Sequence, residues 1–184
     1  MESPESQTIR IEKARPEDVL GMQEVIYRAW LATYPNEVHR ITVADIEERF
    51  KDRLSPEILE KRRERFANPS EGETTLVARD GEKVIGICRV IVHDDRNEQA
   101  AFYLLPEYQR CGIGTRLWKE AQKYVDPSRP SFVHVATYNA PAIAFYESVG
   151  YQDTGKRFLD DRFKLKSGAQ IPEMEMVLKG NIKD

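Results

Sequence analysis

The spacing of apolar residues changes from strand-like to helix-like over the first forty positions of the chain. Residues 9–14 alternate apolar and charged side chains, as a half-buried strand does. Pro16 follows at a place where the first turn of a helix tolerates proline. From 19 to 30, apolar residues recur three and four positions apart, which predicts an amphipathic helix that ends at Pro35.

Two shorter amphipathic helices are expected next. Thr42 begins the first, with Asp45 three residues later in an arrangement that resembles a capping box. The second starts at the Ser-Pro-Glu of residues 55–57 and extends to about Phe66.

The middle of the chain has the pattern of a strand meander. Strands are predicted over 74–79 and 83–92, and Asp80-Gly81 between them is a strong hairpin signal. A polar turn at 93–97 precedes a third apolar run at 100–105, which Pro106 ends.

The C-terminal part combines helices with strands. A helix is predicted over 113–125 and a strand over 132–137, and this strand-helix-strand order favours parallel pairing of the two strands. Asn139 is placed to cap a further helix that Gly150 ends. Residues 151–156 and 174–178 are expected to close the sheet. We therefore expect one domain over 9–178, with flexible tails at 1–8 and 179–184.

Composition narrows the class of protein. Hydrophobic residues at 40% and charged residues at 32% are typical of a globular protein, and no apolar run approaches the ~20 residues of a membrane span. The first seven residues do not have the pattern of a secretory signal. Cys88 and Cys111 lie in different expected elements, without the dense spacing of a disulfide framework. These features predict a reduced, cytoplasmic setting and no membrane partner.

The charge of the chain argues against a nucleic-acid-binding protein, and the spacing of its histidines and cysteines argues against a metal-binding one. A net charge of -3 gives no field that attracts nucleic acid, and the basic run at 61–65 has glutamates interleaved along a predicted helix. His39, His93 and His134 show no metal-ligand spacing with one another or with the cysteines, so no metal is expected.

The turn between the third apolar run and the next helix has the chemistry of an anion site. Gly112 and Gly114 stand two residues apart, where glycine permits positive φ and close approach of a ligand to the backbone. The start of the helix adds unsatisfied N-H groups and about half a positive charge. By itself this signal is weak, because the spacing also occurs in plain tight turns and in dinucleotide-binding folds.

The turn is one of two segments that resemble motifs of the GNAT family of N-acetyltransferases. Residues 109–114 read Gln-Arg-Cys-Gly-Ile-Gly, similar to the Q/R-x-x-G-x-G/A signature. Residues 139–151 resemble the second motif, N-x-x-A-x-x-F-Y-E-x-x-G-F/Y. Cys111 and Pro141 are minor departures, and neither removes an amide from the turn. The resemblance implies one GNAT-like α/β (α+β) domain. Its mixed, mostly antiparallel twisted sheet would have six to seven strands splayed at a bulge, with helices on both faces.

The resemblance also implies acetyl-coenzyme A as co-substrate. Its pyrophosphate would bind the amides of the turn, and its pantetheine arm would bind the strand before it. Asn139 matches a position that contacts pantetheine, although its side chain can equally be a helix cap, or be both. The implied cofactor residues are Phe102, Tyr103, Leu104, Gln109, Arg110, Cys111, Gly112, Ile113, Gly114, Thr115, Asn139 and Tyr146.

Two residues are candidates for catalysis. Tyr146 matches a tyrosine that in many family members protonates the thiolate of coenzyme A, and a phenol suits this role because its pKa of ~10 is close to that of a thiol. Packing against the sheet is its other interpretation. Glu98 corresponds to a position where some members carry a catalytic or water-binding glutamate, and it can also be a solvated strand end.

Acceptor specificity is less defined. Tyr34 and His39 lie beyond the first helix, where the family usually builds one wall of the acceptor cleft. Asp160, Asp161 and Glu173 could favour a cationic substrate, although aspartate is also common in turns. We expect N-acetylation of a small-molecule amine, such as an amino acid, a polyamine or an amine-bearing antibiotic, by a monomer or homodimer. Acetylation of a protein N-terminus or lysine, and a non-catalytic coenzyme A-binding module, are the alternatives.

Overall fold

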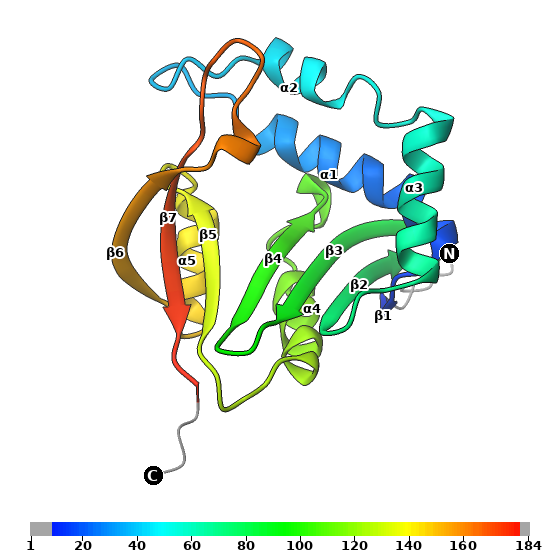
Figure 1. Ribbon diagram of the computed structural model, residues 1–184, viewed down its shortest axis with the longest axis vertical. Coiled ribbons are helices and arrows are strands. Elements are labelled where there is room, and N and C mark those ends of the chain that lie inside the picture. The colour runs from blue at the N-terminus through cyan, green and yellow to red at the C-terminus, as the bar shows by residue number, and fades with distance from the viewer. Residues whose placement is uncertain (1–8, 181–184) are drawn as a thin grey trace, which may run out of the picture.

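The computed structural model describes residues 9–180 and has one sheet of seven strands in the order β1-β2-β3-β4-β5-β7-β6 (Figure 1). The strands are β1 (Arg10–Lys13), β2 (Glu73–Asp80), β3 (Lys83–Val92), β4 (Asn97–Leu104), β5 (Ser131–Ala136), β6 (Gln152–Leu159) and β7 (Pro172–Leu178). All neighbouring pairs are antiparallel except β4 and β5, which are parallel. The predicted mixed, mostly antiparallel sheet is therefore confirmed, and so is the parallel pairing across the helix that joins β4 to β5.

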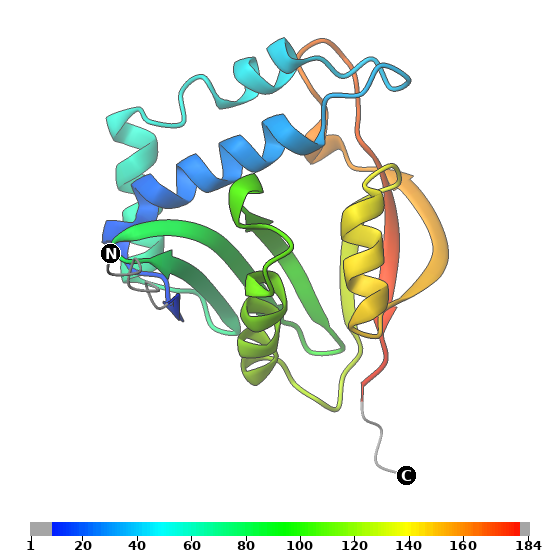
Figure 2. The same cartoon turned by 180° about the vertical axis from the view of Figure 1, so that it is seen from behind.

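Within residues 9–180, five α-helices flank this sheet. They are α1 (Val19–Thr33), α2 (Val43–Phe50), α3 (Pro56–Ala67), α4 (Ile113–Ala121) and α5 (Ala140–Ser148). Figures 1 and 2 show α4 and α5 over one face of the sheet and α1 on the other, with α2 and α3 outside α1. Helices cover both faces, as predicted.

Local chemistry explains where several helices begin. The Thr42 side chain accepts a hydrogen bond from the Asp45 amide while Asp45 accepts one from the Thr42 amide, which confirms the capping box. The Ser55 and Asn139 side chains accept from the amides of Ile58 and Ala142 in the same way. Pro56 and Pro141 occupy first-turn positions, where no amide partner is lost.

Some predicted boundaries were wrong. The meander strand starts at Asn97 and not at residue 100, because the buried Asn97 side chain anchors this end through hydrogen bonds to the carbonyls of Asp126 and Arg129. The helix expected over 113–125 ends as an α-helix at Ala121 and continues as a 3-10 turn, Gln122–Tyr124. The last two strands also differ from the predicted ranges of 151–156 and 174–178. β6 extends over Gln152–Leu159, and β7 begins earlier, at Pro172.

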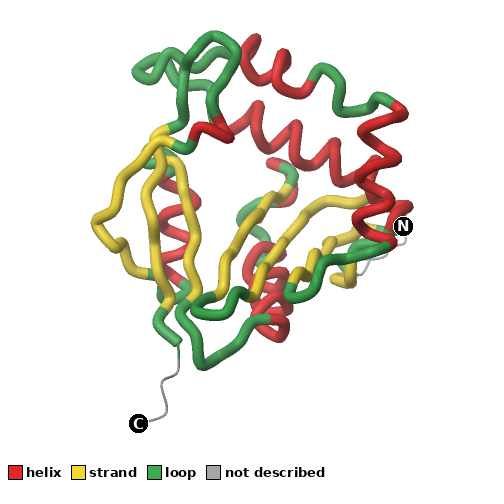
Figure 3. The backbone as a smooth tube through the Cα atoms, in the orientation of Figure 1, coloured by secondary structure: helices red, strands yellow, loops and turns green. Residues whose placement is uncertain are grey.

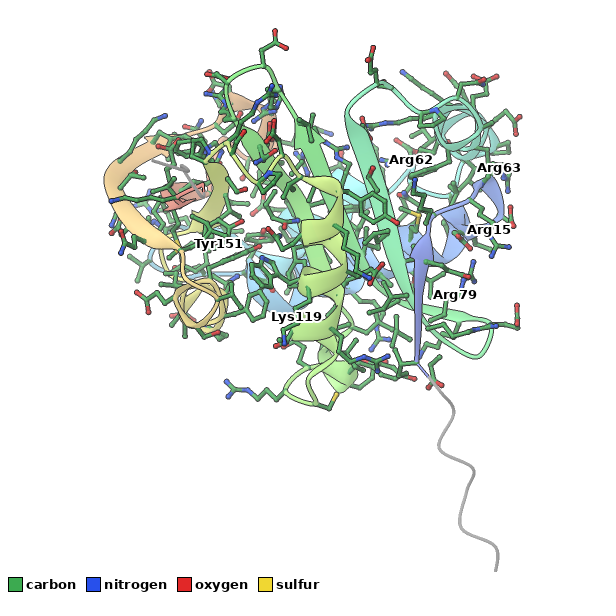
Figure 4. All side chains as sticks on the ribbon, turned by 90° about the horizontal axis from the view of Figure 1, so that it is seen from below. Arg15, Arg62, Arg63, Arg79, Lys119 and Tyr151 are labelled. Carbon is green, nitrogen blue, oxygen red and sulfur yellow. The ribbon has the colours of Figure 1, made fainter. Side chains whose placement is uncertain are left out.

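Apolar side chains fill both sides of the sheet. A large cluster joins α1, β2, β3 and α4, and a second joins α5 to β5 and β7. Tyr151, which Figure 4 labels at the end of the molecule opposite to Arg15 and Arg79, belongs to the second cluster. The predicted tail at 1–8 and residues 181–184 of the predicted tail at 179–184 lie outside the described residues.

Candidate functional site

The central feature of the site is the divergence of β4 from β5. These strands pair only over Asn97–Gln99 against Ser131–Val133, after which they separate (Figure 3). The register of β3 against β4 shifts between Arg89 and Val90, so that Ala100 is an extra residue on β4. Gln99 stabilises this bulge by donating through Nε2 to the carbonyls of Arg89 and Ala101. The predicted splay at a bulge is thus present.

The divergence leaves part of the β4 backbone without a strand partner. Leu105 donates to the carbonyl of Ile85 on β3, and alternate residues of a strand direct their peptide groups to the same side. The peptide groups of Tyr103 therefore face β3, whereas those of Phe102 and Leu104 face the gap. Of the three predicted backbone contacts, Phe102 and Leu104 are suitably oriented, and Tyr103 contributes its side chain instead.

The glycine turn lies at the same end of β4 and leads into α4. Arg110 and Gly112 have φ values of +60° and +80°. Among residues 9–180, no amide from residue 110 to residue 115 donates to a backbone carbonyl or a side chain. The Gln109 side chain donates to the carbonyl of Leu104 at 3.2 Å and ties the turn to the strand. Free amides at a helix start are a ready site for an anion.

The two glycines serve this turn in different ways. At Gly112 a Cβ would meet nothing within 4 Å, so the positive φ and not space requires glycine there. At Gly114 a Cβ would lie 3.8 Å from the Phe102 ring and 3.9 Å from the Phe145 ring, in ordinary contact. Gly114 therefore leaves room beside two stacked rings whose centroids are 5.2 Å apart.

One cavity of about 770 Å³ connects the two faces of the sheet through the gap. On the α4 and α5 side it is lined by the glycine turn and α5, and on the α1 side by the end of α1 and by residues of β5 and β7. Twelve of the residues predicted from sequence line it: Tyr34, Glu98, Phe102, Tyr103, Leu104, Gln109, Arg110, Gly112, Gly114, Thr115, Asn139 and Tyr146. Residues predicted from distant segments are brought together at one site.

Three predicted residues do not line this cavity. Cys111 is exposed and its Sγ donates to the carbonyl of Tyr108 at 2.8 Å. Ile113 is buried in the core, which leaves only its amide for a ligand. His39 stacks on the Tyr138 ring at 5.1 Å and so supports a residue that does line the cavity.

Tyr146 is buried where the gap meets α5. Its ring packs against Phe102, Phe145 and Tyr151, with centroids 6.2, 5.4 and 5.3 Å away. Burial raises the pKa of Tyr146 well above the usual value of a phenol, so the hydroxyl keeps its proton at neutral pH. A protonated phenol can act only as a hydrogen-bond donor or proton donor toward a basic atom in the cavity.

The α1 side of the cavity carries aromatic rings. Trp30 Nε1 donates to Tyr103 Oη at 3.2 Å, and Tyr138 Oη donates to the carbonyl of Tyr34 at 3.0 Å. Burial raises the pKa of Tyr34 and Tyr103 and raises that of Tyr138 to about 12. Glu98 also lines the cavity, and its Oε2 lies 3.0 Å from His93 Nε2.

Glu173 on β7 lines the cavity, and the sequence indicated it only as an acidic residue that could favour a cationic substrate. It is only 8% exposed, and its Oε2 is buried without a hydrogen-bond partner. Burial and the charge of Asp160 raise its pKa to about 7, whereas Arg162 lowers it. The local sequence shows the charge of Glu173 but not its place at the gap, because only the pairing of β7 with β5 brings it there.

Two of the expectations from the sequence concern a membrane-spanning helix and a metal site. No helix within 9–180 is long and apolar enough to span a bilayer. Over the same stretch of chain, no group of three or more His, Cys, Asp or Glu side chains is placed to hold a metal ion.

Comparisons with known proteins agree with this geometry. A family model described as an acetyltransferase (GNAT) domain matches residues 71–153, which include the splay, the turn and α5. A probable N-acetyltransferase of Mycobacterium tuberculosis is 31% identical over 106 residues, covering 56% of this chain and 59% of that relative. The match thus spans little more than half the length of the relative.

Solved structures share the fold at low identity. The PaiA N-acetyltransferase of Thermoplasma acidophilum, in complex with coenzyme A, is 23% identical with a TM-score of 0.67, over 94% of this chain and 99% of that one. The ribosomal-protein-S18-alanine N-acetyltransferase of Escherichia coli is 18% identical with a TM-score of 0.63, over 96% and 97%. A putative acetyltransferase of Salmonella typhimurium with acetyl-coenzyme A is 19% identical with a TM-score of 0.59, over 96% and 95%.

Proposed function

The chain belongs to the GNAT family of acetyltransferases, and we propose that it transfers the acetyl group of acetyl-coenzyme A to a primary amine of a small molecule. The observation that carries this proposal is the cavity that runs through the sheet. One end has free amides for a phosphate, and the other has aromatic rings and a carboxylate for an amine. Donor and acceptor can therefore meet in one ternary complex for direct attack.

The residues of the first end fit the cofactor. The amides of residues 111–115 would hold the pyrophosphate, with Gln109 and Arg110 at its sides. The peptide groups of Phe102 and Leu104 face the gap and would bind the pantetheine arm as a further strand does. The Asn139 side chain is engaged with the Ala142 amide, so it acts at least as a cap. When bound, acetyl-coenzyme A supplies an acetyl group activated as a thioester.

The chain must supply a proton donor and a route for the protons of the amine. In the overall reaction an ammonium and a thioester give an amide, a thiol and one released proton. The C-N bond forms as the C-S bond breaks, and we assign Tyr146 to protonate the departing sulfur. The phenolate left on Tyr146 then takes up the second proton that the nitrogen loses as the amide forms. Its buried hydroxyl is protonated at neutral pH, and the same desolvation that raises its pKa also favours protonation of a thiolate in the cavity.

Glu98 has a narrower part in this proposal. Its carboxylate lines the cavity but is bound by His93, and its side chain is 33% exposed. These features suit a residue that orders water at the mouth of the acceptor side. A cytoplasmic setting and a monomeric or homodimeric state stay predictions.

An assay of thiol release from acetyl-coenzyme A over a panel of primary amines tests the proposal. We expect release that depends on the amine, and an acetylated amine in the mass spectrum. Mass spectrometry of cell extract incubated with the enzyme distinguishes a protein acceptor from a small one. Tight cofactor binding with no acetylated product in the panel or in the extract would instead support a non-catalytic coenzyme A-binding module.

A further inference from the structure

Glu173 is a buried carboxylate of the acceptor side that has no ion pair of its own among residues 9–180. Its Oε2 is buried without a hydrogen-bond partner, and Arg162, whose charge lowers the pKa of Glu173, is itself bound by Asp160. The neighbouring acids differ: Asp160 is bound by Arg162, and Glu175 is bound by Lys156 and His134. A buried charge without a partner is costly, so this position is completed best by a cation from outside the chain.

The surroundings of Glu173 favour an organic ammonium over a metal ion. Tyr34, Tyr103 and Tyr138 line the same cavity, and aromatic faces attract organic cations. A single carboxylate cannot replace the oxygen shell that a hard divalent cation requires. A primary ammonium needs few acceptors and leaves its carbon chain against the rings.

On the basis of the proposed function, we infer that Glu173 binds the ammonium of the acceptor and removes its proton before acetyl transfer. The proton passes from the ammonium nitrogen to the Glu173 carboxylate, which leaves a neutral amine and a carboxylic acid. The nitrogen lone pair is then free to attack the thioester. Glu173 afterwards releases its proton to water through the open end of the cavity.

The electrostatics of the pocket are consistent with this role. Burial raises the pKa of Glu173 to about 7, so near neutral pH the group can both bind and release a proton. The titratable and charged groups around it come from every neighbouring element: Tyr34, Glu98, Tyr103, His134, Tyr138, Asp160 and Arg162. Of these, His134 carries an imidazole side chain that lines the cavity, so it requires its own control.

The test compares Glu173→Gln with Glu175→Gln, a matched control two residues along the same face of β7. For the amine that the wild type acetylates fastest, Glu173→Gln should lose about 10²-fold or more in kcat/KM. The rise of kcat/KM with pH through about 7 should disappear, while the KM for acetyl-coenzyme A stays unchanged. Glu175→Gln should stay within about threefold of the wild type.

Two more variants keep the result interpretable. Glu173→Asp retains the charge on a shorter side chain, so it should keep the pH dependence with part of the activity. His134→Asn should retain the rise near pH 7. If Glu173→Gln keeps the wild-type pH profile and kcat/KM, or if His134→Asn abolishes the rise, the inference is wrong.

A measurement without turnover separates this inference from the proposed function. We would follow the Glu173 carboxylate by infrared difference spectra between wild type and Glu173→Gln, with 2-phenylethylamine as the probe. The probe should shift the titration of this carboxylate to lower pH, because a bound ammonium stabilises its charge. If the wild type shows this shift but transfers no acetyl group, the ammonium site at Glu173 stands and the proposed acetyltransferase activity is wrong. If the wild type transfers acetyl groups but the probe does not shift the carboxylate titration, the activity stands and the role of Glu173 is wrong.

Discussion

The two ends of the cavity differ in whether backbone or side chains form them. The cofactor end consists mainly of backbone: free amides over residues 110–115, a left-handed Gly112 and the unpaired edge of β4. The acceptor end consists of side chains from α1, β4, β5 and β7. Backbone geometry that depends on a few local residues can hold the same donor in many proteins. Side chains gathered from distant segments can change one at a time, which allows the acceptor to differ.

The largest expected effect is at the junction of these two ends. Tyr146→Phe should lower kcat by ~10² to 10⁴ and leave acetyl-coenzyme A affinity unchanged, because it removes only a proton donor. Stopped-flow or steady-state thiol release measures the rate, and calorimetry measures binding. Tyr151→Phe is the control, since Tyr151 is a buried tyrosine that packs on Tyr146 but does not line the cavity. Equal losses in both variants would make Tyr146 a packing residue.

The second prediction concerns stability at the acceptor end. The folded-state pKa of Glu173, about 7, lies above the ordinary value, so the folded chain favours the protonated form. The stability that this preference contributes is complete below the pKa of an unfolded glutamate and is lost as pH rises through about 7. Glu173→Gln lacks this loss. Its free energy of unfolding should exceed that of the wild type by on the order of 1 to 3 kcal/mol at about pH 8.

Urea unfolding at several pH values checks this prediction, and the advantage of the variant should shrink as pH falls toward ~4. A variant that is less stable than the wild type at every pH would mean that the carboxylate has an internal partner. In that case the fold itself would neutralise Glu173, and the acceptor end would not need a cation from outside the chain.

The third prediction concerns the cofactor end. Gly114→Ala places a methyl group in ordinary contact with Phe102 and Phe145, so the fold should tolerate it. The family signature also accepts alanine at this position, so acetyl-coenzyme A affinity should stay within about threefold of the wild type. Gly112→Ala should instead lower that affinity roughly tenfold, or about 1.4 kcal/mol, and destabilise the fold by ~1 to 2 kcal/mol, because its φ is +80°. Calorimetry and thermal unfolding separate the two effects, and unchanged affinity in Gly112→Ala would remove the turn from the site.

The smallest effect is expected at the wall of the acceptor end. Tyr138→Phe removes the hydrogen bond to the carbonyl of Tyr34 and should cost about 1 kcal/mol of stability. The KM for the amine should rise while the KM for acetyl-coenzyme A stays constant. If only the KM for acetyl-coenzyme A changes, Tyr138 belongs to the cofactor end of the cavity and not to the acceptor end.

The same contrast explains what the sequence could predict. Helix starts at Thr42, Ser55 and Asn139, and the turn before α4, depend on neighbouring residues, so local patterns identified them. The start of β4 at Asn97 depends on carbonyls some thirty residues away, and no local pattern encodes that distance. The place of Glu173 beside the gap could not be predicted for the same reason, since β7 reaches the gap only by pairing with β5.

A crystal structure of the protein with coenzyme A tests the division of the cavity most directly. The pyrophosphate oxygens should lie about 3 Å from the amides of residues 111–115, with the thiol in the gap between β4 and β5 near Tyr146. The side lined by Tyr34, Tyr138 and Glu173 should stay open for the acceptor. Coenzyme A bound through the Glu173 side, or outside the gap, would contradict the account.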